Sequence, residues 1–496
     1  MNNNTRFNLV AVAFLCFFSS QLTHAGSATW NLNPVDDDWI NPNNWTPTTF
    51  PNGPSDTATF GVSNVSIISL ATDIKVAGII FQSGASAYVL GTAPNGAVLT
   101  LSGAGVTNNS GVSQIIAVLP TFSGPGGIIF ENSASAGSQV SYPNNGVSFG
   151  VPPEIDFLDN SSAGSASFTN SGAFAAGIEG SLILFADNSS AGQATLINNG
   201  ATVAGAGGAI TRFAGTSRAG QATLIANTGQ SGGEGGVIEF TERGDGVQAS
   251  VQVFGNGTLQ IVNSVKNKVT IGSLEGDGVV FTSSPISSLV VGSNGRSTTF
   301  AGKITGYASL RKIGRGTLEL TGNNGSSGST IVEDGTLLIN NRTGYGTNAS
   351  VGVSAGTLGG HGKIGGLVSV GYSARGRIAP GLGGHTPARL FVGVSVNFYS
   401  NASLECKLYP ALKASDSVNA SGVTIAAGAV FSFLGDTNEQ IAPGTVFTLI
   451  KNRGASAIDG NFSNLPDGET VTSNGNKFLV DYEGGDGNDL TLTVVP

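Results

Sequence analysis

The chain has 496 residues, with 75 glycines, 18 prolines and a formal net charge of -9. Glycine at about twice its usual ~7 % disfavours a helical protein, and without a three-residue glycine period collagen is excluded. Charged residues make up 11 % and apolar residues 40 %, a balance that excludes charge-driven disorder. Because phosphate binding needs a basic face, no nucleic-acid partner is expected. We expect an all-β protein with many turns.

The first 25 residues are typical of a secretory signal peptide. Arg6 precedes an apolar run from Leu9 to Phe18, and small residues mark a cleavage point after Ala25. That run is too short to span a bilayer, and no later apolar stretch reaches the ~20 residues of a transmembrane helix. We therefore predict an exported chain without a transmembrane segment, in which Cys406 is the only cysteine and is half-buried and inert.

A phenylalanine recurs at nearly constant spacing through the middle of the chain. The intervals are 27, 28, 28 and 27 residues, and an Ala-Gly pair follows six residues after each of the first four. Short apolar runs between Asn, Gly and Ser turns leave no room for a helix, and one such unit cannot bury its own apolar face. A fixed period therefore predicts stacked coils of a parallel β-solenoid. The five residues are Phe130, Phe157, Phe185, Phe213 and Phe240.

A shorter period follows, in which Gly-Thr-Leu begins at Gly316, Gly335 and Gly356. We expect coils of the same kind but fewer residues, and atypical segments at both ends, because a solenoid end exposes unpaired strand edges. The fold class predicted is a right-handed parallel β-helix. Its parts are a signal peptide at 1–25, a Trp- and Pro-rich cap at 26–75, solenoid repeats at 76–387 and a C-terminal β cap at 388–496; coils of 27–28 residues cover about 128–256 and shorter coils about 257–387.

Residues 316–340 resemble the autotransporter-associated β-strand repeat of secreted bacterial passenger proteins. The resemblance implies a β-helical protein that is extracellular or held at the outer surface. Residues 388–496 are fewer than the roughly 250 that a translocator barrel needs, so we expect a passenger without its own barrel; a periplasmic end point stays open. Similar segments of the same large proteins are seen at 271–278, 291–302, 310–318 and 484–492, and in the Ala-Gly-Gln-Ala repeats.

Two short motifs match patterns of catalytic or nucleotide-binding sites. Residues 360–365 fit G-x-G-x-x-G, which works only where a helix follows to receive pyrophosphate, and none is expected here. Residues 352–356 fit the hydrolase elbow around Ser354, whose chemistry needs a histidine base, and His361 and His385 lie in Gly-rich turns. Both matches are expected by chance at this glycine content. We assign no catalytic residue and no cofactor.

Three further features have a structural and a ligand-binding interpretation. Residues 484–492 fit the calcium-binding nonapeptide, but in one copy only, which favours a tight turn and leaves calcium binding open. The aspartates at 36–38 favour a turn cap over a cation patch. Trp39 and Trp45 either stack on sugar rings or, with Trp30, plug the end of the solenoid, and the plug is favoured. We assign no metal ligand.

Repetition with little chemical variety predicts a structural or adhesion protein, not an enzyme, secreted or exposed at the cell surface. The alternatives are a glycan-binding protein and a carbohydrate-active β-helix enzyme acting on an acidic polysaccharide. Expected partners are cell-surface or matrix glycans or proteins, and the oligomeric state stays open. Isolated charges form no readable acid–base pair: Glu179, Arg212, Arg218, Glu239 and Glu242.

Overall fold

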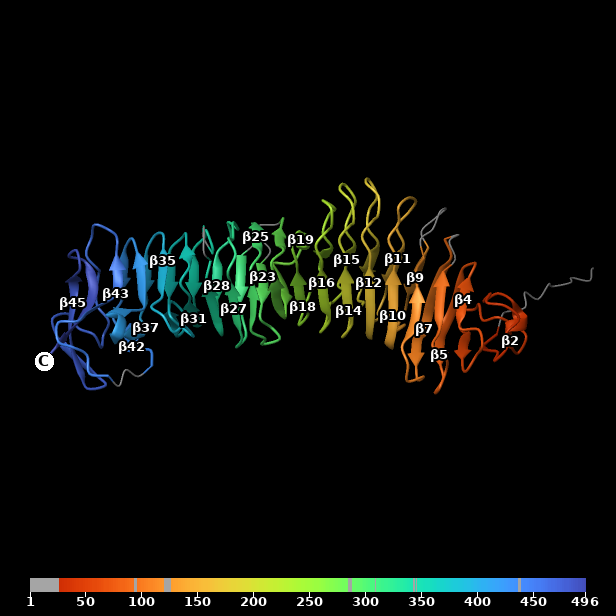
Figure 1. Cartoon of the computed structure of the whole chain (residues 1–496), viewed down its shortest axis with the longest axis horizontal. Coiled ribbons are helices and arrows are strands. Elements are labelled where there is room, and N and C mark those ends of the chain that lie inside the picture. The colour runs from red at the N-terminus through yellow and green to blue at the C-terminus, as the bar shows by residue number, and fades with distance from the viewer. Residues whose placement is uncertain are drawn as a thin grey trace, which may run out of the picture.

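The computed structural model describes residues 26–92, 96–119, 126–283, 288–307, 309–341, 344, 346–435 and 439–496. The predicted signal peptide lies outside these residues. The described chain forms a long rod of stacked β coils, with the N-terminal segment at one end and the C-terminal segment at the other (Figure 1). Its only helical elements are two short 3-10 turns, η1 (Pro42–Asn44) and η2 (Pro410–Leu412), in the part that the structure describes.

Two long sheets form the main faces of the rod, and successive coils add one strand to each. Sheet A has the order β2 (Trp45–Thr46), β1 (Ala28–Trp30), β3 (Thr57–Phe60), β5 (Ile74–Phe81), β7 (Val98–Asn108), β9 (Gly127–Phe130), β11 (Glu154–Phe157), β13 (Leu182–Phe185), β15 (Ile210–Phe213), β17 (Val237–Glu242), β19 (Thr258–Ser264), β22 (Val279–Thr282), β25 (Lys303–Gly306). Sheet B has the order β4 (Ile67–Leu70), β6 (Val89–Thr92), β8 (Gln114–Ala117), β10 (Ser138–Asn144), β12 (Ser165–Asn170), β14 (Thr195–Asn198), β16 (Thr223–Ala226), β18 (Ser250–Val253), β21 (Ser273–Gly276), β24 (Thr298–Phe300), β27 (Thr317–Leu320), β29 (Thr336–Ile339), β31 (Gly356–Gly359), β34 (Gly376–Ala379), β37 (Ala402–Cys406), β42 (Val430–Phe433).

Two further sheets accompany them in the C-terminal part. Sheet C has the order β20 (Lys268–Ile271), β23 (Ser288–Val291), β26 (Ser309–Lys312), β28 (Thr330–Val332), β30 (Val351–Val353), β33 (Val368–Val370), β36 (Val396–Phe398), β41 (Val423–Ile425). Sheet D has the order β32 (Lys363–Ile364), β35 (Arg389–Val392), β40 (Ser417–Ala420), β43 (Val446–Asn452), β46 (Asp489–Val495), β45 (Asn476–Gly484), β44 (Thr470–Ser473), and a separate hairpin joins β38 (Leu408–Tyr409) to β39 (Ala414–Ser415).

The strands within sheets A, B and C pair in parallel with strands of the next coil, except that β1 and β2 are antiparallel. Each coil therefore covers the strand edges of the coil before it, which confirms the parallel β-helix. Parallel pairing runs from β3 near the N-terminus to β43, whereas β44, β45 and β46 form an antiparallel meander that joins β43 through β46. The predicted limits of the two caps stay predictions.

The repeated phenylalanines form a column inside the N-terminal half. Phe157 lies in register with Phe130 on one side and Phe185 on the other, and each is fully buried. Successive ring centroids are 4.6, 4.5, 4.8 and 5.1 Å apart from Phe130 to Phe240, with nearly parallel planes. Because alternate strand residues face inward, one phenylalanine at a fixed place in each coil is sufficient to build this column.

The Ala-Gly pairs form the corner that follows each of these phenylalanine strands. Gly192 has a φ of 59°, and a Cβ there would lie 2.6 Å from the carbonyl oxygen of Gly164 in the preceding coil. The neighbouring Ala191 is fully buried. A side chain at the glycine position would strain the backbone and block the stacking, so the recurrence of Ala-Gly follows from the corner geometry.

The coils differ in kind, and not only in length, between the two halves. In the longer coils, loops such as 171–181 and 199–209 project beyond the sheets and are closed at the base by backbone hydrogen bonds, Ser181 N to Ser171 O at 3.1 Å and Ala209 N to Asn199 O at 3.0 Å. Figure 1 shows these loops rising above β11 to β15. From β20 onward the coils carry a strand of sheet C instead, so the solenoid gains a third face.

Asparagines lie stacked at the bases of the projecting loops. Asn144, Asn170 and Asn198 are fully buried. The Asn144 amide donates to the Asn170 side-chain oxygen at 2.8 Å, and the Asn170 amide donates to Asn198 at 3.2 Å. Asn170 also donates to the backbone oxygens of Ser181 and Ile210. This ladder satisfies backbone groups where the chain leaves the regular sheet.

Candidate functional site

The tryptophans at the N-terminal end lie inside the molecule. Trp30, Trp39 and Trp45 are at most 2 % exposed and pack edge-on around one another and against Phe60. Their ring N–H groups donate to backbone oxygens, for example Trp39 Nε1 to Pro51 O at 2.9 Å. A buried ring has no face for a sugar, so these residues cover the end of the core.

The aspartates and the cysteine singled out in the sequence have structural partners. The Asp36 carboxylate accepts hydrogen bonds from the amides of Asn41 and Asn44, at 2.7 and 2.6 Å, and the Asn44 bond contributes most to lowering the pKa of Asp36. Cys406 is fully buried, not half-buried, because it occupies an inward position of β37. Burial raises the pKa of its thiol, which is consistent with an inert residue.

The two catalytic-type motifs lie in strand-to-strand turns. Residues 360–365 lead into strand β32, so no helix N-terminus is present there for a phosphate. The exposed His361 donates its backbone N–H to Asn340 Oδ1 at 3.0 Å. Ser354 lies between β30 and β31 and donates to the backbone oxygen of Val332 at 3.2 Å. Neither motif has the local geometry that its chemistry requires.

The calcium-type nonapeptide 484–492 forms the turn between β45 and β46, and a lysine contacts its carboxylates. Lys451 Nζ lies 2.7 Å from Asp486 and 2.8 Å from Asp489, while Asp489 also accepts the backbone N–H of Asn452. The hydrogen bond from Lys451 lowers the pKa of Asp486. One ammonium group thus contacts both of the carboxylates that would ligate a cation.

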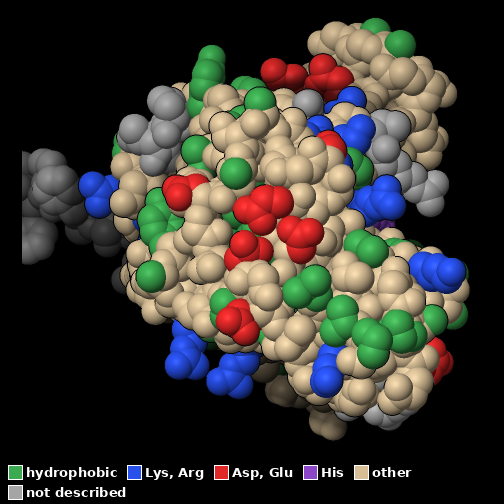
Figure 2. Space-filling view, turned by 90° about the vertical axis from the view of Figure 1, so that its left-hand side faces the viewer, with side chains coloured by type: hydrophobic (Ala, Val, Ile, Leu, Met, Phe, Trp, Pro, Cys, Tyr) green, Lys and Arg blue, Asp and Glu red, His purple; other side chains and the backbone are tan. Residues whose placement is uncertain are grey.

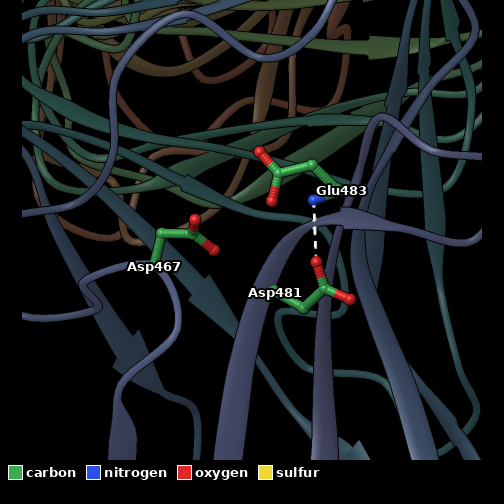
Figure 3. A group of neighbouring side chains, drawn as sticks. All are labelled: Asp467, Asp481 and Glu483. Atoms are coloured by element: carbon green, nitrogen blue, oxygen red, sulfur yellow. Dashed lines mark hydrogen bonds between the residues drawn. The ribbon is translucent and has the colours of Figure 1, made fainter.

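Acidic side chains gather near the middle of the C-terminal end of the rod (Figure 2). Among the described residues one carboxylate group could hold a metal by spacing, Asp467, Asp481 and Glu483, with oxygens within 4.8 Å of one another. Figure 3 shows Asp481 accepting the backbone N–H of Glu483, at 2.8 Å. Asp467 likewise accepts the N–H of Tyr482 at 3.1 Å. Two of the three carboxylates therefore hold the local backbone.

An extended groove runs along the outer face of sheet B and the turns that follow its strands. It consists of three adjoining hollows of about 500, 630 and 600 Å³, all of which are lined by Glu319. The first hollow begins at Gln252 and Phe254, and the third ends against the segment 380–388. We call this surface the axial groove. It passes over strands β18, β21, β24, β27 and β29 and then over the turns that follow β31 and β34.

Glu319 is held in the axial groove by residues of the neighbouring coils. Thr299 Oγ1 donates to Glu319 Oε2 at 3.0 Å, and the Asn340 amide donates to Oε1 at 2.8 Å. Thr299 is the register partner of Glu319 in the sheet. Both carboxylate oxygens keep lone pairs for a further donor, because each carboxylate oxygen accepts about two hydrogen bonds.

The charges along the groove balance. Glu275 lies 3.5 Å from Arg296, and Glu319 and Lys303 supply one further charge of each sign. This surface is not evident in the sequence, because its floor residues come from coils of unequal length. The available signal was the outward position in each strand, which Gln252, Glu275 and Glu319 share.

A further buried charged group is a lysine of sheet C. Lys312 occupies an inward position of β26, is 1 % exposed, and donates to the backbone oxygens of Ile313, Gly314 and Asp334 at 2.8, 2.7 and 3.2 Å. Burial lowers its pKa to about 8, while the charge of Asp334 acts in the opposite direction. The side chain closes a corner by satisfying three carbonyl groups that no strand pairs.

Two comparisons with known proteins place these coils in context. The family described as passenger-associated-transport-repeat matches residues 310–339. A segment of 91 residues is 42 % identical to the adhesin BmaC autotransporter of Brucella suis biovar 1 (strain 1330). The chain is autotransporter passenger-like. The aligned segment is 18 % of this chain and 3 % of the adhesin, so the chain spans a small part of that relative.

The passenger-like repeat coincides with a defined piece of the solenoid. Residues 310–339 run from β26 to β29, and include Lys312 and the groove residue Glu319. In it Leu318 and Leu337 face the core at 1 % exposure or less, while Thr317 and Thr336 lie side by side on the outer face. Within the described residues, no helix has the length and apolar character needed to cross a membrane.

Proposed function

We propose that this chain is an adhesive, non-catalytic scaffold that is secreted or displayed at the outer cell surface. The observation that carries the proposal is the similarity to an autotransporter adhesin, together with a passenger-type repeat that forms regular coils of the solenoid. A rod whose coils each pair with the next is stable over its length and presents a long side surface to partners. Cell-surface or matrix glycans or proteins are the expected partners.

Adhesion is tested with beads that carry the purified full chain, applied to monolayers of cultured epithelial cells under flow. We expect more retained beads than with beads that carry heat-unfolded chain, because the adhesive surface depends on the stacked coils. Equal retention of folded and unfolded chain, or retention no higher than with albumin-coated beads, would contradict the proposal.

A further inference from the structure

We propose that the axial groove binds one extended, neutral, polyhydroxylated chain, that is, a neutral glycan, with the Glu319 carboxylate as its central contact. This inference rests on the proposed adhesive function and names the partner class of one surface. It uses three observations that are independent of the buried tryptophans: the shape of the groove, its hydrogen-bonding groups and its charge balance.

The shape of the groove fits a chain better than a small molecule. It follows seven successive coils, from the coil of β18 to the coil of β34, so it extends over about 29 Å for six spacings of ~4.8 Å. Glu319 lines all three hollows, and Asn340 and His361 line two of them, so the hollows adjoin along the axis. A ligand that contacts all three hollows must be elongated.

The lining groups match hydroxyl groups of a ligand. Carboxylate oxygens accept from hydroxyls, amides both donate and accept, and hydroxyls do either. Glu319 is fixed from both sides by Thr299 and Asn340, so little side-chain freedom is lost when a ligand binds. At one end Phe254 is 38 % exposed and offers an aromatic face beside Gln252. Such polar groups with one aromatic platform are suited to a sugar chain.

The net charge of the groove disfavours a polyanion or a polycation as its ligand, and the pairing of its strands disfavours an added peptide strand. The two acidic and two basic groups of the groove, Glu275, Glu319, Arg296 and Lys303, cancel, so neither a polyanion nor a polycation is attracted by net charge. The floor strands β21 and β27 are paired on both sides within sheet B. The groove therefore presents side chains and no free strand edge, which an added peptide strand would require.

The test uses the full chain on a printed array of neutral oligosaccharides of increasing length, with soluble dextran and mannan as competitors. We expect retention of at least one neutral series, with affinity that rises with chain length until the ligand spans the groove. Glu319→Ala is expected to weaken binding about 10- to 100-fold, because a charge-assisted hydrogen bond is lost. Phe254→Ala, at an exposed side chain, is expected to weaken it about tenfold.

The matched control is Glu239→Ala, which removes a half-buried, ion-paired glutamate from the outer face of sheet A, outside the groove. It is expected to leave binding unchanged. Thermal unfolding of each variant shows that the coils remain, and Glu319→Gln, which keeps the side-chain volume, replaces Glu319→Ala if the latter fails to fold. It is expected to weaken binding as well, because the amide cannot accept at both positions.

The glycan proposal is overturned if the wild-type chain retains no neutral glycan, if it retains only acidic glycans or peptides, or if Glu239→Ala weakens binding as much as Glu319→Ala. The bead assay separates this from the proposed function. Beads that attach while the array stays blank contradict the groove alone, and a positive array with beads that fail to attach contradicts adhesion alone.

Discussion

The solenoid fills its interior in two different ways along its length. Between β9 and β17 the two-sheet coils enclose a column of five stacked phenylalanines. In the three-sided coils around β27 to β37, most inward positions hold aliphatic residues such as Leu318, Leu337 and Leu404, each at most 1 % exposed, and no column of stacked rings is formed among the described residues. Because protein interiors are close-packed, the size of the inward side chains and the number of sheets that enclose them change together.

The two regions also differ in where the residues of each coil that lie outside sheets A and B are placed. The longer coils place their extra residues in projecting loops over the buried asparagine ladder. The shorter coils use them for a strand of sheet C, and their sheet B carries the axial groove. Regular stacking therefore tolerates a change of cross-section, provided that sheet B continues through both regions in register.

The largest expected effect concerns the phenylalanine column. Phe185→Ala should lower the free energy of unfolding by ~3–5 kcal/mol, because it leaves a cavity between Phe157 and Phe213 in a fully buried stack. Leu337→Ala, the matched change in the three-sided region, should cost about 2–4 kcal/mol because the lost side chain is smaller. Urea unfolding of both variants measures this, and a Phe185→Ala cost below that of Leu337→Ala would contradict the packing account.

Next in size is a pH dependence of opposite sign in the two regions. The pKa of Lys312 is about 8 in the folded chain and ~10.4 unfolded. Between these values the unfolded chain holds a proton that the folded chain has released, so the free energy of unfolding should rise with pH, by at most roughly 3 kcal/mol. The free energy of unfolding, measured from pH 8 to 9.5, should rise in the wild type, and this rise should be absent in Lys312→Met. An equal slope in both proteins would contradict the assignment.

Asp156 on β11 should give the reverse slope. Its Oδ1 is buried without a hydrogen-bond partner among the described residues, and burial, with a smaller effect from Glu154, raises its pKa to about 6. Between pH ~3.9 and 6 the folded chain keeps a proton that the unfolded chain loses, so the free energy of unfolding falls as pH rises, by roughly 1–2 kcal/mol after solvent screening. Asp156→Asn should remove this fall, and an unchanged pH profile would count against it.

The next effect concerns the buried ladder of asparagine side chains, which can be compared with an exposed ladder of glutamine side chains. Asn170→Ala should destabilise the chain by about 1–3 kcal/mol, because it removes the hydrogen bonds of a fully buried amide to Ser181 and Ile210 and interrupts the ladder between Asn144 and Asn198. In this variant the backbone amides at the bases of the neighbouring loops should also exchange their hydrogens faster. A loss smaller than ~0.5 kcal/mol would show that the ladder is dispensable.

The smallest expected effect is the matched control at the surface. The Gln221 amide donates to Gln248 at 3.1 Å across neighbouring coils, but both side chains are exposed. Gln221→Ala should therefore change the free energy of unfolding by no more than about 0.5 kcal/mol. A cost equal to that of Asn170→Ala would mean that stacking itself, and not burial, gives an amide ladder its strength.

The sequence was sufficient where one coil repeats another. The phenylalanine column, the Ala-Gly corners and the inward leucines of Gly-Thr-Leu all follow from alternation and a fixed period. It was insufficient where partners come from unequal coils. Lys451 reaches Asp486 from 35 residues away. The third face and the axial groove were missed for the same reason, because loop lengths set which residues become neighbours. By contrast, Arg212 and Glu239 form an ion pair at 2.6 Å as register partners of two regular coils, so the repeat period itself could have paired these two charges.

Small-angle X-ray scattering of the full chain tests the central claim, that all coils stack into one continuous rod, most directly. Sheet B alone has 16 strands, so fifteen spacings of ~4.8 Å require a particle at least about 70 Å long before the caps are added. The account predicts rod-like scattering with a radius of gyration clearly above the ~23 Å of a compact globule of this length. A globular profile with a radius near that value would contradict it.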